Sequence, residues 1–186
     1  MLSINLRGPR LHIRRAGPED AAAFFRWFAD ATVTAYLPLG GKGSLPLHEI
    51  QAYLGRVATT DRPDVAVGID LIGHGLIGCG GFRNFDGDAA ELSLILGEPS
   101  TWGGGLGTEA LGLLLQFAFE QLALAVVWLV VRADNERAVA LFRRNGFVVV
   151  DRYVGAVVVD DVPRDKVRME LHRGAWGEAA GAQDNE

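Results

Sequence analysis

Hydrophobic and polar positions change between two periods along the chain, which predicts alternating strands and helices. Residues 10–16 alternate and predict a first strand, and residues 65–85 predict two strands joined by a turn near Gly73. Further strands are predicted at 90–97, 125–131, 147–159 and 166–172, the last two around a charged turn at 160–165. Apolar residues at helical spacing predict helices at 18–30, 47–57, 105–122 and 136–145. Because no repeat or linker interrupts this series, we expect one mixed α/β domain over residues 1–176 and a disordered tail over 177–186.

A glycine cluster lies between the strand at 90–97 and the helix at 105–122. Four of the five residues from Gly103 to Gly107 are glycine. Glycine in ordered structure costs conformational entropy, so such a cluster indicates that the backbone must approach something closely. A strand, a glycine-rich turn and a helix start also present unpaired N–H groups at the positive end of the helix dipole. The pattern therefore predicts an anion-binding site on residues 102–108.

Two common phosphate-binding motifs fit this loop poorly. A Walker loop needs a lysine directly after its last glycine, and the loop contains none. A dinucleotide fingerprint GxGxxA fits Gly105, Gly107 and Ala110, with Asp134 at the end of the next strand. However, Asp134 lies 29 residues after Gly105, whereas about 20 is usual. The dinucleotide interpretation is therefore the weaker alternative.

The ordered stretch ELSLILGEPSTWGGGLGTEAL…RADNERAVALFRRNGF resembles the GNAT superfamily of N-acetyltransferases. It is most similar to the branch that acetylates the N-termini of ribosomal proteins (RimJ/RimL-like), through Asn135-x-x-Ala138 followed by Gly146-Phe147. The resemblance implies the acyl-CoA N-acyltransferase fold, a twisted and mostly antiparallel sheet flanked by helices. It also implies acetyl-CoA as co-substrate, with its diphosphate on the glycine loop. The expected reaction is direct acetyl transfer to a primary amine without a covalent enzyme intermediate.

By this resemblance, cofactor contacts come from the strand end, the glycine loop and the next helix. Trp102 stands where the family usually has Arg or Gln, and Phe142 stands where many relatives have a tyrosine that protonates the leaving thiolate. A phenyl ring cannot donate a proton, so Ser93, Tyr153, water or unassisted departure remain open. The expected cofactor residues are Ile95, Leu96, Gly97, Trp102, Gly103, Gly104, Gly105, Leu106, Gly107, Thr108, Asn135, Ala138 and Phe142.

Alternation along residues 91–97 separates a polar face from a leucine face. Glu91 and Ser93 lie opposite the leucines, and we predict both to be catalytic. By the resemblance, Glu91 matches a candidate general base that acts through water; a solvated carboxylate at a strand edge is the alternative. Asn135 is also a good N-cap for the helix that follows. Trp27 and Tyr36 are candidates for acceptor contact.

Composition narrows the class of partner. The net charge of −5 and the pI of about 5.4 argue against a nucleic-acid surface and favour a cationic acceptor. A protein N-terminus, an aminoglycoside and a polyamine all satisfy that charge. A module that binds acyl-CoA without turnover is the alternative from another functional class, since Phe142 removes the usual acid.

Several features are expected to be absent. Cys79 is the only cysteine, which excludes an internal disulfide and a multi-cysteine zinc site, and the four histidines have no metal-ligand spacing. The start of the chain lacks a signal-peptide pattern, and no stretch approaches about 20 apolar residues. We therefore expect a cytoplasmic protein with no metal and no membrane segment. The resemblance adds a homodimer, because relatives often dimerise.

Overall fold

The computed structural model describes residues 3–37, 45–60 and 64–176. Within these ranges one sheet has the strand order β1-β2-β3-β4-β5-β6-β8-β7. Every neighbouring pair is antiparallel except β5 and β6, as the mostly antiparallel prediction requires. The strands are β1 (Asn5–Arg7), β2 (Leu11–Arg15), β3 (Val65–Leu71), β4 (Gly75–Asp86), β5 (Ala89–Leu96), β6 (Val126–Arg132), β7 (Val148–Val159) and β8 (Val162–His172).

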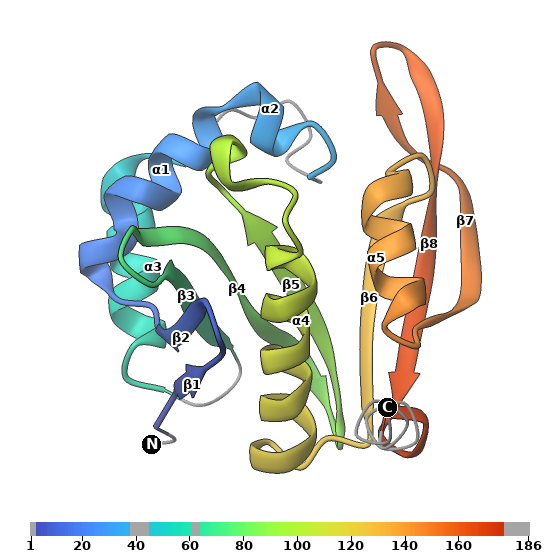
Figure 1. Cartoon of the computed structure of the whole chain (residues 1–186). Coiled ribbons are helices and arrows are strands. Elements are labelled where there is room, and N and C mark those ends of the chain that lie inside the picture. The colour runs from blue at the N-terminus through green and yellow to red at the C-terminus, as the bar shows by residue number, and fades with distance from the viewer. Residues whose placement is uncertain (1–2, 38–44, 61–63, 177–186) are drawn as a thin grey trace.

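Helices cover the two faces of the sheet unequally (Figure 1). One face of β1–β6 and β8 packs against α4 and α5 in the larger hydrophobic core, and the other face of the first strands packs against α1, α2 and α3 in a second core. The main helices are α1 (Ala21–Ala29), α2 (Ala31–Thr34), α3 (Leu47–Val57), α4 (Leu106–Gln116) and α5 (Glu136–Arg144). Short helical turns η1 (Pro18–Asp20), η2 (Pro99–Thr101) and η3 (Phe117–Gln121) complete the series.

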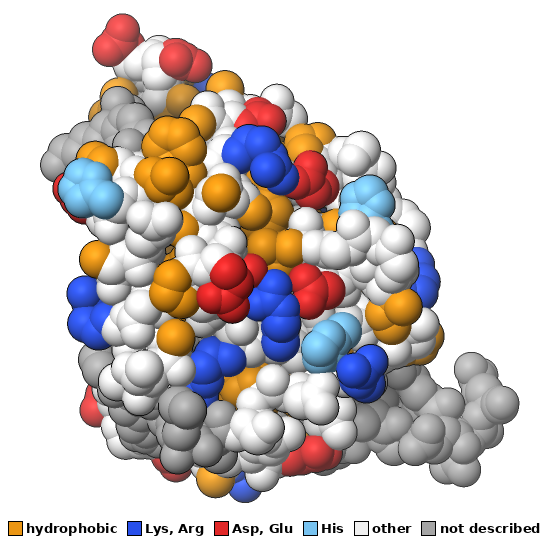
Figure 2. Space-filling view, turned by 90° about the vertical axis from the view of Figure 1, so that its left-hand side faces the viewer, with side chains coloured by type: hydrophobic (Ala, Val, Ile, Leu, Met, Phe, Trp, Pro, Cys, Tyr) orange, Lys and Arg blue, Asp and Glu red, His pale blue; other side chains and the backbone are white. Residues whose placement is uncertain are grey.

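Helix α1 is anchored to the sheet by an ion-pair network. Asp20 is 5% exposed and accepts two hydrogen bonds from the Arg14 guanidinium of β2, at 2.8 and 2.9 Å. Asp70 of β3 pairs with the same guanidinium at 2.9 Å. The hydrogen bonding that Arg14 donates to Asp20, together with both carboxylate charges, raises the pKa of Arg14 despite burial. Figure 2 shows the molecule from the side of α1, α3 and β2. Acidic and basic side chains lie next to one another there, rather than forming a surface of one charge sign.

The structure adds two elements to the predicted series and changes two predicted ones. The strand β1 and the short helix α2 were not predicted, because three or four residues carry too little periodicity. The predicted turn at 160–165 is mostly strand: β8 begins at Val162, and only Asp160 and Asp161 take positive φ between the strands. The predicted helix at 105–122 ends as α-helix at Gln116 and continues as a π-helical turn. The glycine- and proline-rich segment 36–46 between the first two predicted helices is expected to be a loop; its residues 38–44, and the predicted tail 177–186, lie outside the described ranges.

Strands β5 and β6 pair over only three residues and then part. The parallel register joins Ala89, Ala90 and Glu91 to residues 126–128. Beyond it, β5 pairs with β4 and β6 pairs with β8. We call the two segments that no longer pair with each other, Leu92–Leu96 of β5 and Leu129–Arg132 of β6, the fork. Figure 1 shows these two strands separating toward their C-terminal ends.

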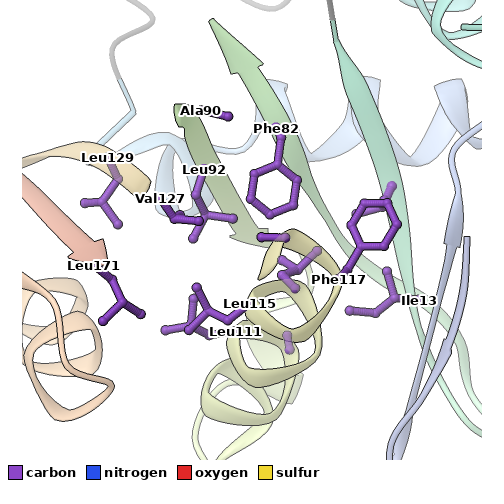
Figure 3. Close-up of a cluster of buried hydrophobic side chains, with 14 of the residues drawn as sticks. Ile13, Phe82, Ala90, Leu92, Leu111, Leu115, Phe117, Val127, Leu129 and Leu171 are labelled. Carbon is purple, nitrogen blue, oxygen red and sulfur yellow. The ribbon is translucent and has the colours of Figure 1, made fainter. Parts of the chain in front are cut away.

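The closed end of the fork rests on the main hydrophobic core. Figure 3 shows Leu92 of β5 and Val127 of β6 turned toward the side of α4, where Leu111 lies. These three side chains are at most 4% exposed. Because close-packed interiors resist deformation, this packing gives the fork a rigid base. Among the described residues, no helix is long and apolar enough to cross a membrane.

Candidate functional site

The backbone of β5 has one edge that faces the fork. The N–H of Gly97 donates to the carbonyl of Ile77 at 2.8 Å, so Gly97 is turned toward β4. Backbone groups of alternate residues in a strand point to opposite sides. Ile95 is therefore also turned toward β4, while Leu94 and Leu96 present their N–H and C=O groups to the fork. Of the three strand residues predicted to hold the cofactor, only Leu96 faces the fork, and Leu94 joins it.

The glycine loop needs glycine at three consecutive positions. Gly103, Gly104 and Gly105 have φ values of 93°, 54° and 79°, a region that other residues rarely adopt. Gly105 ends the loop as the N-cap of α4, and Leu106 turns its side chain into the core. The first N–H groups of α4, including those of Gly107 and Thr108, have no partner within the helix. The loop therefore combines left-handed glycines with free N–H groups at a helix start, and anion binding there stays a prediction.

Arg10 and Glu109 brace this loop, and sequence analysis missed both. The Glu109 carboxylate of α4 accepts the backbone N–H groups of Arg10 and Leu11 at 2.8 and 2.9 Å. Arg10 donates through Nε to Glu109 at 2.8 Å and through Nη1 to the Gly104 carbonyl at 2.5 Å. The β1–β2 turn is therefore fastened to the loop across 94 residues of sequence. The one available signal was an acidic residue in the first turn of a helix, which names no partner.

Trp102 closes the loop against the end of β5. Its Nε1 donates to the Leu96 carbonyl at 2.9 Å, and the guanidinium of Arg137 lies 5.0 Å from its ring centroid. Since Arg137 belongs to α5, this contact connects the two sides of the fork. The indole accordingly replaces the polar Arg or Gln of the family pattern with a packed ring next to a cation.

Glu91 lies at the closed end of the fork and is 8% exposed. Arg83 binds its two carboxylate oxygens at 3.1 and 3.0 Å, and the Asn84 amide donates at 2.6 Å. The hydrogen bond that Arg83 donates to Glu91 is the main cause that raises the pKa of Arg83. A carboxylate has about four acceptor positions, so three donors leave about one for a water or a ligand. Ser93 follows on the same face and is half-buried.

The Asn135 side chain caps α5, as its alternative role predicted. Its oxygen accepts the N–H of Ala138 at 3.2 Å. Phe142 is buried in the main core, with its ring centroid 5.5 Å from that of Phe147. The phenyl ring at this position therefore packs in the core beside Phe147, and its predicted cofactor contact stays a prediction. Cofactor contact by Asn135 or Ala138 stays a prediction.

The predicted acceptor contact at Trp27 does not fit the structure. Trp27 is 1% exposed, its indole packs on Gly97, and its Nε1 donates to Glu98 at 2.8 Å. The bond from Trp27 is the main cause that lowers the pKa of Glu98. Sequence periodicity could not separate this core tryptophan from a surface one. Tyr36 is 44% exposed beside the Arg132 guanidinium and stays a candidate.

Cys79 is buried, and burial is the main cause that raises its pKa to about 12, so it is no nucleophile at neutral pH. The described residues contain no group of His, Cys, Asp and Glu side chains arranged to hold a metal ion.

Comparison with known proteins agrees with this geometry. The family profile of the acetyltransferase (GNAT) domain matches residues 10–148. Spermidine N(1)-acetyltransferase of Escherichia coli is 31% identical over 80 residues, a match that spans 43% of this chain and 42% of that protein. The crystal structure of spermidine N-acetyltransferase from Vibrio cholerae in complex with CoA and spermine has a TM-score of 0.82 at 19% identity, covering 91% of this chain and 99% of that one.

A second solved structure, a GNAT-family acetyltransferase from Bacillus anthracis, has a TM-score of 0.75 at 17% identity and covers 90% of this chain and 98% of its own. At such identities the likeness concerns the fold, which confirms the predicted GNAT architecture. The family profile confirms the family, while the relatives carry spermidine acetyltransferase names, so the comparisons do not confirm the RimJ/RimL branch. The chain belongs to the GNAT acetyltransferases, a family whose acyl donor is acetyl-CoA.

Proposed function

We propose that the protein transfers the acetyl group of acetyl-CoA to a primary amine of a small cationic molecule. The observation that carries this proposal is the fork, with the unpaired edge of β5 leading to a glycine loop at the start of a helix. An extended pantetheine arm can pair with such an edge as an added strand does. The diphosphate then meets the N–H groups of the loop and the positive end of α4.

The reaction follows from what surrounds the β5 edge. An N–H of Leu94 or Leu96 donates to the thioester oxygen and stabilises the negative charge that develops there. The neutral amine attacks the carbonyl carbon, the C–S bond breaks, and the amide forms. A proton leaves the amine through a water hydrogen-bonded to Glu91. The thiolate takes a proton from Ser93 or water, or leaves as the anion, since a thiol is fairly acidic.

Two observations support a small cationic acceptor. The relatives with spermidine acetyltransferase names turn over a polycation, and the acidic net charge of this chain favours cations. A protein N-terminus, which the RimJ/RimL resemblance favours, is the second candidate acceptor. Its support is the Asn135-x-x-Ala138 and Gly146-Phe147 pattern.

The test is calorimetric titration of the protein with acetyl-CoA, with dephospho-CoA and NAD as control ligands. We expect micromolar binding of acetyl-CoA and no heat with NAD. NAD binding without acetyl-CoA binding would contradict the proposal and favour the GxGxxA interpretation. An amine screen follows, with spermidine, an aminoglycoside and a peptide with a free N-terminus. Binding of acetyl-CoA with no acetylated amine would identify a sensing module.

A further inference from the structure

Arg132 is a buried cation that the proposed reaction does not use. It is the last residue of β6 and is 8% exposed, although its side chain ends at the open end of the fork. Its guanidinium donates to both Asp134 oxygens, at 2.9 and 2.6 Å. Burying a guanidinium costs several kcal/mol unless it is fully paired, so the arrangement of its remaining donors matters.

The remaining donors reach across the fork. Nη1 of Arg132 donates to the Ala35 carbonyl at 2.8 Å, a bond between residues 97 apart in sequence. The guanidinium also lies 4.8 Å from the centroid of the Tyr36 ring. Ala35 and Tyr36 directly follow α2, which packs through Val33 into the core shared by α1 and α3. The contact therefore connects β6 with the half of the molecule that contains β5.

The register shows which side of the fork this contact covers. Glu91 pairs with Trp128, so these two side chains lie on the same face of the sheet. Alternation then places Arg132, four residues after Trp128, on that face as well. It is the face opposite the buried Val127 and Leu129, which turn toward α4. Arg132 and Tyr36 thus stand at the open end of the face on which Glu91 and Ser93 lie.

We propose that Arg132 is a positioning residue that holds Ala35 and Tyr36 over the acceptor side of the fork and so sets the affinity for the amine. This inference rests on the proposed function. A preformed wall lowers the ordering cost that the acceptor would otherwise meet on binding. Only a planar guanidinium can donate twice to Asp134, donate to Ala35 and stack on a ring at once. Lysine at position 132 keeps the charge and loses that geometry.

The main variant is Arg132→Met, with spermidine or the best amine of the screen as acceptor. We expect KM for the amine to rise about tenfold, with kcat and the Kd for acetyl-CoA close to wild type. Arg132→Lys should give an intermediate KM. The double variant Arg132→Met with Asp134→Asn removes both charges, so that a folding defect from an unpaired carboxylate is separated from the loss of the contact.

Arg164→Met is the matched control. Nε of Arg164 lies 3.8 Å from Oδ2 of Asp134, the oxygen that also accepts from Nη2 of Arg132. The Arg164 side chain lies on β8 and is 43% exposed. The Arg164→Met variant should have the same KM for the amine as the wild type. An unchanged amine KM in Arg132→Met, or an equal rise in both variants, would overturn the inference.

Hydrogen–deuterium exchange of residues 31–37 gives a readout that needs no acceptor. We expect faster exchange in Arg132→Met and wild-type exchange in Arg164→Met. If the wild-type protein acetylated no amine, the proposed function would be wrong. Hydrogen–deuterium exchange would then be the measurement that tests whether Arg132 holds Ala35 and Tyr36 in place. Unchanged exchange in Arg132→Met would refute this role, and faster exchange would uphold it.

Discussion

The indole ring of Trp27 fills the space that a side chain at Gly97 would need. A Cβ at this position would overlap the ring of Trp27, whereas a Cβ at Gly112 of α4 would meet nothing within 4 Å. A side chain in place of glycine should therefore have opposite effects on stability at these two positions. Gly97 also donates its N–H to Ile77, so its place at the end of β5 is held from both sides.

Gly97→Ala should destabilise the protein by about 3 kcal/mol, because neither the buried indole nor the paired backbone can move away. Gly112→Ala is the control and should stabilise it by about 0.5–1 kcal/mol, as alanine does inside a helix. Urea denaturation measures both. Equal stabilities for the two variants would show that Trp27 does not confine Gly97.

Glu91→Gln tests the role of the Glu91 carboxylate at the closed end of the fork. The amide keeps the size of the side chain, and its one oxygen can still accept from Arg83 Nε and Asn84, but its NH2 group loses the bond from Arg83 Nη2 and the side chain cannot take a proton from water. We expect kcat to fall about 10²-fold, with the Kd for acetyl-CoA unchanged. Asp70→Asn, another arginine-paired carboxylate, on β3, should retain kcat. A Glu91→Gln enzyme with normal kcat would leave Glu91 a structural partner of Arg83.

At the scale of elements, α4 is positioned by its first turn as much as by its apolar face. Its buried leucines pack on the sheet, but the loop that precedes it is held by Glu109. Burial by itself would raise the pKa of Glu109; the hydrogen bonds from Arg10 and the Leu11 N–H outweigh burial and lower it. The helix start is therefore stabilised by an ionised carboxylate.

The contribution of the Glu109 carboxylate to stability depends on pH in a defined direction. A lowered pKa in the folded state means that the contribution is complete above the unfolded value, about 4.3 for glutamate, and is lost as the pH falls through the folded pKa. Glu109→Gln should reduce the free energy of unfolding by about 1–2 kcal/mol at pH 7. The difference from wild type should shrink below about pH 4. Urea denaturation across pH 3–7 measures it.

Glu49→Gln is the control for that series. Glu49 is also acidic in the first turn of a helix, α3, but it is exposed. The change should cost less than about 0.5 kcal/mol at every pH. A Glu109→Gln deficit that stayed constant from pH 7 to pH 3 would show that its charge is not what braces the loop.

At the scale of the whole molecule, the two halves of the sheet meet through three parallel pairs at the base of the fork. The outer half ends in β7, an edge strand with exposed valines, among them Val154 at 81%. Apolar edge strands promote pairing with another strand. Two copies of β7 can pair antiparallel about a two-fold axis, which is a self-complementary contact.

We therefore expect a homodimer through β7. Val154→Lys should shift the protein toward monomer in sedimentation equilibrium, because a buried lysine would oppose the pairing. Ile72→Lys changes an equally apolar exposed residue, 55% exposed at the β3–β4 turn, and should leave association unchanged. A wild-type protein that stayed monomeric at all concentrations would exclude this interface.

Much of the fold and the loop follows from local pattern. Alternation placed Leu92 and Ile95 on opposite faces of β5, and the two packed cores confirm it. Consecutive glycines predicted a loop whose backbone side chains would obstruct, and the structure gives Gly103, Gly104 and Gly105 positive φ. The failures are equally physical. Trp27 was a candidate for acceptor contact, yet its burial depends on Gly97, which lies 70 residues away in sequence. Arg10, Arg132 and Glu109 act through partners that no local pattern names.

The sequence by itself determined the series of elements, the anion loop and the family resemblance, because each of these depends on residues close together in the chain. The tertiary structure alone decided which strand edges stay open, which carboxylates are paired with arginines, and which aromatic rings are buried. These are properties of distant segments brought together by packing. The parallel contact of β5 and β6 shows the difference: each strand was visible in the sequence, and the fork between them was not.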